Sequence, residues 1–175
     1  GGNLLEDNTV YVDPMLPARL SNDLCSLRPR VVRRTVTAEM LVGPDGEITG
    51  ERFYRSAIRS ERRLTYPEVD EHLRGISLEG GPAMEATVAA AREAARRLRL
   101  RRMARGALEV SSSEPVFRIE NDRVLGVHLE EQTESHRIVE DCMIAANEAV
   151  ARYLIARGRP TLHRFHDEPD VRRIE

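Results

Sequence analysis

The segment from Thr133 to Gly158 constrains the fold of this chain more than any other, because its length and periodicity predict one long helix. At about 3.6 residues per turn, its apolar side chains share one wide arc of the helix surface. The members of this arc are Ile138, Val139, Cys142, Met143, Ala145, Ala146, Ala149, Val150, Tyr153 and Leu154. Asp141, Glu148 and Arg152 form a narrow stripe that we expect to face water. Other parts of the fold must therefore cover the apolar arc.

Three polar residues lie at the edge of this arc rather than on the charged stripe. His136, Glu140 and Asn147 fall within about 40° of one another on the helical wheel. A buried carboxylate without a hydrogen-bond donor is costly, so Glu140 should face either an internal cation or a cleft. The three residues form either a structural polar network or a ligand-facing site.

Chemical signals mark the ends of this helix and predict a second one. Thr133 or Ser135 can cap the start, and Gly158 can adopt the left-handed conformation past the end, so we expect a helix over about 134–157. Pro82 predicts the start of an alanine-rich helix over about 82–105. Its arginines suit the negative end of the helix dipole, and they could also contact RNA phosphates. They are Arg92, Arg96, Arg97, Arg99, Arg101, Arg102 and Arg105.

Antiparallel strands account for most of the remaining predicted structure. Residues 31–60 have the pattern of a hairpin with a tight turn at 44–46 and a bulge near Gly50. Alternation places four apolar residues on one side of a half-buried first strand: Val36, Ala38, Met40 and Val42. Short strands are expected within about 107–130, at 107–110, 115–120 and 124–130, and a last one at 162–166. The predicted fold class is therefore α+β, with these strands packed against two long helices.

Two short helical segments are also expected. Ser21 or Asn22 could cap a single helical turn within 20–27. Thr65 and Glu68 have the spacing of a capping box, which predicts a short helix that runs to about Leu73.

Arginines follow the returning strand of the hairpin, next to aromatic residues. Arg55 and Arg59 lie near Phe53 and Tyr54 in the sequence. Arginine interleaved with aromatics can follow phosphates and stack on bases, so the two arginines are candidate RNA contacts. The same pattern also fits an ordinary solvated face.

Composition narrows the function classes. The chain carries 27 basic and 29 acidic residues, for a net charge of −2, which argues against a uniformly basic nucleic-acid binder. With no tryptophan, the core is expected to be aliphatic and alanine-rich. Cys25 and Cys142 lack metal-ligand spacing and are expected to be free thiols. Because neither a long apolar stretch nor a charged, apolar leader is present, we expect a cytoplasmic protein that does not span a membrane.

Common motifs for cofactors and metals are missing. No glycine-rich phosphate loop occurs, so no nucleotide cofactor is expected. His136 and Glu140 are spaced i, i+4, but two ligands make a weak metal site, and we expect no metal site in this chain. There is also no cluster of closely spaced aspartates of the kind that binds two magnesium ions.

Several segments, taken in order, resemble the central part of the catalytic (RNB) domain of the ribonuclease II and ribonuclease R exoribonucleases. They are T-V-Y at 9–11, P-M-L-P at 14–17, L-S-N-D-L-C-S-L at 20–27, 53–58, 62–66, 136–147 and R-F-H-D-E-P at 164–169. The resemblance implies magnesium-dependent hydrolysis of single-stranded RNA from the 3′ end, releasing nucleoside 5′-monophosphates. It also implies that Tyr11 stacks on a base near the cleaved end and that Glu140 approaches the terminal ribose.

The resemblance also implies what this chain lacks. The metal-binding aspartates of the family precede the segment of Tyr11, and a second essential arginine motif follows the region of Glu175. We therefore expect residues 1–175 to be a single partial domain, the middle portion of an RNB-type catalytic domain, and to be inactive alone. The alternative is a non-catalytic RNA-binding or scaffold protein with an RNB-like core.

Overall fold

Three antiparallel strand pairs and three α-helices make up the part of the chain that the computed structural model describes, namely residues 3–4, 10–11, 16–108, 114–120, 123–130 and 132–162. The pairs are β1 (Asn3–Leu4) with β2 (Val10–Tyr11), β3 (Val32–Val42) with β4 (Ile48–Arg59), and β5 (Glu114–Glu120) with β6 (Arg123–Glu130). The helices are α1 (Tyr66–Leu73), α2 (Pro82–Ala104) and α3 (Glu134–Ala156). The predicted α+β fold class is confirmed.

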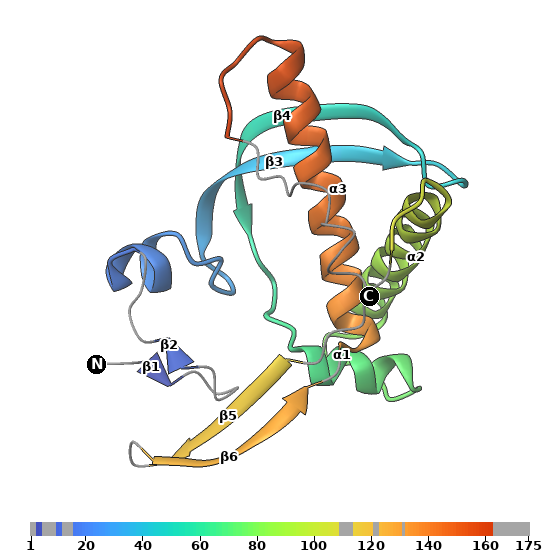
Figure 1. Ribbon diagram of the computed structural model, residues 1–175. Coiled ribbons are helices and arrows are strands. Elements are labelled where there is room, and N and C mark those ends of the chain that lie inside the picture. The colour runs from blue at the N-terminus through green and yellow to red at the C-terminus, as the bar shows by residue number, and fades with distance from the viewer. Residues whose placement is uncertain are drawn as a thin grey trace, which may run out of the picture.

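The β3–β4 hairpin has the predicted turn and bulge. Between the pairs Glu39–Arg52 and Leu41–Thr49, Gly50 and its neighbour Glu51 oppose a single residue of β3. Gly50 has φ +66°, a left-handed conformation that glycine adopts without steric cost, and this is typical of a bulge. The hairpin therefore bends near its turn, and Figure 1 shows it curving across α3 with its turn beside α2.

Burial along β3 is less regular than predicted. Val36 was expected on the same side as Ala38, yet it is 79% exposed while Ala38 is half-buried. The reason is that only the half of the hairpin near the turn packs on a helix. There Phe53 lies against Tyr153 of α3, with ring centroids 4.5 Å apart.

The core lies where α2 and α3 pack side by side (Figure 1). Among the described residues, the buried apolar side chains are Leu78, Val88, Ala95, Ile138, Ala145 and Ala149. Half of them are alanines, so the expected alanine-rich core is confirmed. Small side chains allow two helix backbones to approach closely.

The orientation of α3 differs from the prediction. Asp141 was expected to face water, but it is only 3% exposed. Two members of the predicted apolar arc, Val139 and Met143, are 51% and 53% exposed. The helix is rotated toward its charged side because the arginines of α2 lie there and pair with its carboxylates.

The ends of the long helices largely follow the sequence signals. Pro82 occupies the first turn of α2, as predicted. Thr133 is the N-cap residue of α3, although its side chain makes no capping hydrogen bond. Gly158 follows α3 with φ +58°, the expected left-handed conformation.

The smaller elements agree with the predictions in part. The helical turn within 20–27 is a π-helical turn, η1 (Arg19–Leu24), whose N-cap is Ala18 rather than Ser21 or Asn22. Strands β5 and β6 form the predicted hairpin, whereas residues 107–108 lie outside any strand. The rest of the predicted strand at 107–110, the link at 121–122 between the next two predicted strands, and residues 163–166 lie outside the described residues. None of the described helices combines the length and the hydropathy that a membrane-spanning helix needs.

Candidate functional site

Glu140 lies on the N-terminal half of α3, one turn after His136, and it is half-buried. Within the described part of the chain, its carboxylate makes no hydrogen bond or ion pair. Removing a carboxylate from water without a partner costs free energy. The internal cation that could neutralise Glu140 is not among the described residues.

His136 belongs to a small polar network at the start of α3. Its Nδ1 is 2.7 Å from the Oγ1 of Thr133, which lies 2.9 Å from the Oγ of Ser135. The backbone N–H of Ser135 donates to Oδ1 of the buried Asp70 of α1 at 3.1 Å. Burial by itself raises the pKa of Asp70, but hydrogen bonds from Thr133 and Ser135 outweigh this effect and leave the pKa below its ordinary value. The network thus joins α1 to α3 through an ionised carboxylate.

Tyr66 is the first residue of α1, and its ring stacks on the ring of His136. The centroids are 3.8 Å apart and the planes are inclined by 24°. Tyr66 remains 42% exposed, so part of its ring is still open to contact. Glu140 lies one turn after His136 on α3. Tyr66 belongs to the segment 62–66 of the RNB resemblance but was not predicted as a site residue, although an aromatic residue next to a capping box was a usable signal.

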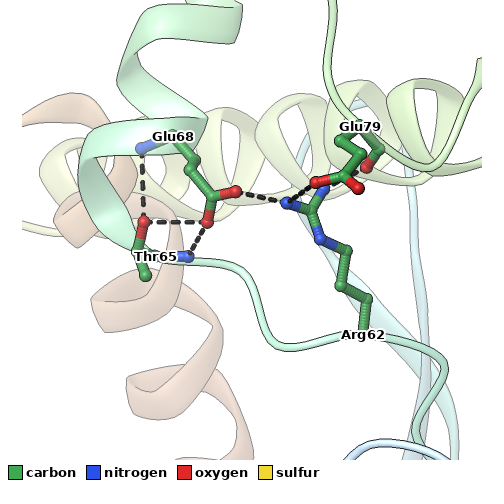
Figure 2. Close-up of polar contacts among 4 residues, drawn as sticks. All are labelled: Arg62, Thr65, Glu68 and Glu79. Carbon is green, nitrogen blue, oxygen red and sulfur yellow. Dashed lines mark hydrogen bonds and ion pairs between the residues drawn. The ribbon is translucent and has the colours of Figure 1, made fainter.

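The start of α1 is held by side chains shown in Figure 2. Thr65 accepts a hydrogen bond from the Glu68 N–H, while the Glu68 carboxylate accepts one from the Thr65 N–H at 2.9 Å, so the predicted capping box is confirmed. Arg62 donates to Glu68 and also to Glu79, at 3.0 Å to its Oε2. These contacts join the chain after β4 and the loop before α2 to the first turn of α1, and they position Tyr66.

Two other predicted site residues are placed apart from this network. Asn147 is exposed and lies two turns beyond Glu140 on α3. Tyr11 is paired with Asn3 in the β1–β2 ladder, in agreement with the strand predicted there. The structure describes the backbone of Tyr11 but not its side chain. The structure therefore brings His136 and Glu140 together on one helix and leaves Asn147 at the surface.

Arg55 and Arg59 both lie on β4 and are exposed. Arg59 pairs with Glu61 at 3.2 Å, whereas Arg55 makes no ion pair with any described residue. Other arginines of the same run have carboxylate partners. Arg52 pairs with Glu39 at 2.5 Å, and Arg62 pairs with Glu68 and Glu79.

The six arginines of α2 and its C-cap residue Arg105 are all engaged by carboxylates. Each has a nitrogen between 2.7 and 3.6 Å from a carboxylate oxygen, on α2 itself, on α3 or in the hairpin turn. Arg99 and Arg102 share the buried Asp141. These ion pairs favour a structural role for the α2 arginines over RNA contact.

A cavity of about 180 Å³ lies between α2, α3 and the hairpin turn. Its charged lining includes Arg102, Arg105, Asp141 and Glu148. Arg102 is bound to Asp141 and Arg105 to Glu148, so the cavity presents paired charges rather than a free cationic site.

The residues that the structure describes do not fit a metal ion. No group of three or more histidine, cysteine, aspartate or glutamate side chains among them could hold one. His136 is stacked on Tyr66 and bound to Thr133, and so its Nδ1 is already engaged. We therefore derive no chemical step through a metal from these residues.

Comparison with known proteins shows which family the chain resembles. The family model for the RNB domain matches residues 8–175. The chain is 34% identical over 167 residues to Ribonuclease R of Escherichia coli (strain K12), covering 93% of this chain and 20% of that protein. It is 36% identical over 166 residues to Ribonuclease R of Thermotoga maritima, covering 93% of this chain and 23% of that protein.

A solved structure has the same fold. Mycoplasma genitalium RNase R in complex with ribose methylated single-stranded RNA matches with a TM-score of 0.79 and 28% sequence identity, over 85% of this chain and 23% of that one. This chain thus spans about a fifth of the length of the curated relatives that it matches. Because the family model covers nearly all of its residues, the chain belongs to the RNB domain family.

Proposed function

We propose that this chain is the central portion of the catalytic domain of a 3′-to-5′ exoribonuclease that hydrolyses single-stranded RNA to nucleoside 5′-monophosphates. Its similarity to ribonucleases named Ribonuclease R supports the reaction class. Its similarity to an RNase R structure in complex with single-stranded RNA supports the substrate class. The observation that carries the proposal within this chain is Glu140, half-buried and without a partner among the described residues.

A carboxylate in this position suits recognition of the terminal ribose. The 2′-hydroxyl of RNA is both a donor and an acceptor, and a carboxylate is an acceptor only. Glu140 would accept a hydrogen bond from that hydroxyl, and binding would then recover the free energy lost by its partial burial. Tyr66, fixed on His136 beside α3, would limit the space around the same nucleotide.

We assign the other contacts as follows. Tyr11 would stack on a base near the cleaved end, and Arg55 and Arg59 would contact phosphates. Magnesium is the proposed cofactor of the whole enzyme, bound by ligands other than the described residues of this chain. The chain alone is accordingly proposed to be inactive.

The test is degradation of a 3′-end-labelled single-stranded RNA in the presence of magnesium. The samples are this chain, the full-length protein and two variants of that protein, Glu140→Gln and Glu148→Gln. Glu148 is the matched control because it lies on the same helix but pairs with Arg105. We expect an inactive chain, an active full-length protein, a clear loss of rate for Glu140→Gln and little change for Glu148→Gln.

A second substrate tests whether Glu140 recognises the terminal ribose. The full-length protein should prefer RNA that ends in ribose over the same RNA with a 2′-deoxy terminal nucleotide, and Glu140→Gln should reduce this preference. An inactive full-length protein that still binds RNA with strong salt dependence would instead support a non-catalytic RNA-binding protein with an RNB-like core.

A further inference from the structure

One face of the β3–β4 hairpin carries three exposed arginines. Among the described residues, only one of the three has a carboxylate partner. Arg34 lies opposite Ala57, between the pairs Val36–Arg55 and Val32–Arg59. Because side chains alternate along a strand, Arg34, Arg55 and Arg59 point to the same side of the hairpin. The bulge near Gly50 lies closer to the turn than these pairs, so it does not change which side of the hairpin their side chains face. We call this surface the arginine face.

The arginine face is open to solvent. Its three arginines are exposed, and the flanking Val32 and Val36 are 64% and 79% exposed. Figure 1 shows this half of the hairpin, at the start of β3 and the end of β4, extending away from α2 and α3.

The charges on this face are largely uncompensated. Within the described part of the chain, Arg34 and Arg55 make no ion pair, and Arg59 has only Glu61, two residues further along. The arginines along α2 are different, since each of the six within the helix, and Arg105 at its C-cap, has a carboxylate partner. The carboxylates that pair with the arginines along α2 have no counterpart beside Arg34 and Arg55 among the described residues.

The arrangement is also unfavourable for the isolated fold. Residues on a diagonal between two strands lie about 7 to 8 Å apart, so Arg34 is close to two like charges. The mutual repulsion of these charges is modest in water, but it raises the free energy of the folded state. A surface that costs stability and exposes guanidinium groups is best explained by an anionic partner.

We propose that the arginine face binds the phosphate backbone of single-stranded nucleic acid, at a place separate from Glu140 and the terminal ribose. This inference rests on the proposed function, because RNA is the polyanion that such an enzyme meets. Guanidinium binds phosphate through paired hydrogen bonds, so three guanidinium groups on one face of a hairpin suit a phosphate backbone.

The proposed surface recognises charge and not sequence. Its side chains provide no aromatic platform and no acceptor for a 2′-hydroxyl, so it should bind RNA and single-stranded DNA equally well. The Glu140 site, in contrast, is proposed to distinguish ribose from deoxyribose.

The test measures binding of labelled oligouridylate and oligodeoxythymidylate of equal length to this chain, with EDTA present, over a range of salt concentrations. The variant carries Arg34→Gln, Arg55→Gln and Arg59→Gln. The matched control carries Arg74→Gln, Arg96→Gln and Arg159→Gln, which remove the same charge from exposed sites off the hairpin. Thermal melting of each protein checks that it folds, and a single Arg55→Gln variant replaces the triple variant if that protein does not.

Each phosphate contact contributes about 0.7 to the slope of log affinity against log salt for single strands. The arginine-face variant should therefore lower the slope by about 2, and the single variant by about 0.7, equally for RNA and DNA. The control should change the slope much less.

Three results would overturn the inference: no nucleic-acid binding by the unmodified chain, an unchanged slope in the arginine-face variant, or an equal loss in the control. Binding of polyglutamate that is lost in the variant, with RNA binding intact, would assign the face to an acidic protein instead. These results would also remove the phosphate contacts proposed above for Arg55 and Arg59. They do not bear on degradation by the full-length protein or on Glu140→Gln, so failure of the arginine face is distinguishable from failure of the exoribonuclease proposal.

Discussion

The carboxylate of Asp141 on α3 meets the guanidinium group of Arg99 on α2, with Oδ2 and Nε 2.8 Å apart and the Asp141 side chain only 2% exposed. Arg102, almost one turn later on α2, donates to the other oxygen at 2.9 Å. One buried charge is thus shared by two cations of the neighbouring helix. The contact fixes the rotation of α3 about its axis and therefore decides which of its side chains reach the surface.

Replacing Asp141 should destabilise the fold strongly. Asp141→Asn removes the negative charge and leaves two guanidinium groups partly buried without it, so we expect the free energy of unfolding to fall by about 3 kcal/mol. Urea denaturation followed by circular dichroism measures this change.

Glu93→Gln is the matched control for that experiment. Hydrogen bonds from Arg96 and then Arg97 lower the pKa of Glu93 to about 2, but the pair is exposed on α2 and solvent screens it. The midpoint of denaturation should hardly change. If the two substitutions lowered the free energy of unfolding equally, burial of the ion pair would not be what makes Asp141 important for stability.

The hairpin turn depends on a glycine at position 46. Gly46 is buried with φ +77°, and an added Cβ would clash with the carbonyl group of Arg97. Gly75 has φ +108° but open space around it, so Gly75→Ala measures the backbone strain alone, about 1 to 2 kcal/mol. We expect Gly46→Ala to destabilise clearly more than Gly75→Ala in the same denaturation assay. A similar loss for both would mean that the turn can move away from α2.

The buried Asp70 should make stability depend on pH at the acid end. Its folded pKa lies below the ordinary value of 3.8, so the ionised carboxylate stabilises the fold above that value, and this contribution is lost as the pH falls through the lowered pKa. Asp70→Asn should be less stable at pH 6 and should lose less stability between pH 6 and pH 2. Parallel stability curves for the two proteins would contradict this prediction.

The two thiols should differ in reactivity. Burial, followed by the charge of Asp141, raises the pKa of Cys142, whereas Cys25 is exposed. A thiol reagent at pH 8 should therefore modify Cys25 quickly and Cys142 slowly, and Cys25→Ser should abolish the fast phase only. A fast phase that persists in Cys25→Ser would assign it to Cys142.

Local signals in the sequence predicted most of the fold. The capping box at Thr65, the helix start at Pro82 and the left-handed Gly158 each depend on a few neighbouring residues, and all three are confirmed. The bulge at Gly50 is confirmed for the same reason. The RNB resemblance was also visible in the order of short segments, and the family match bears it out.

Local signals gave the wrong prediction where contact with another helix decides whether a side chain is buried. The helical wheel treated Asp141 as solvated because it could not include the arginines of α2, which lie about 40 residues away in the sequence. The wheel did identify Glu140 as unusual, but not Tyr66, since the contact of Tyr66 with His136 joins two helices.

The sequence by itself determined where the three α-helices begin and where the β3–β4 hairpin turns, because caps, turns and periodicity act within a few residues. It also determined the family, and with it the expectation that Glu140 matters. Only the tertiary structure decided which face of α3 is buried, which arginines are paired, and that Arg34, Arg55 and Arg59 share an open face. Burial and ion pairing depend on residues far apart in the chain, and the free energy of a charge depends on what the fold brings beside it.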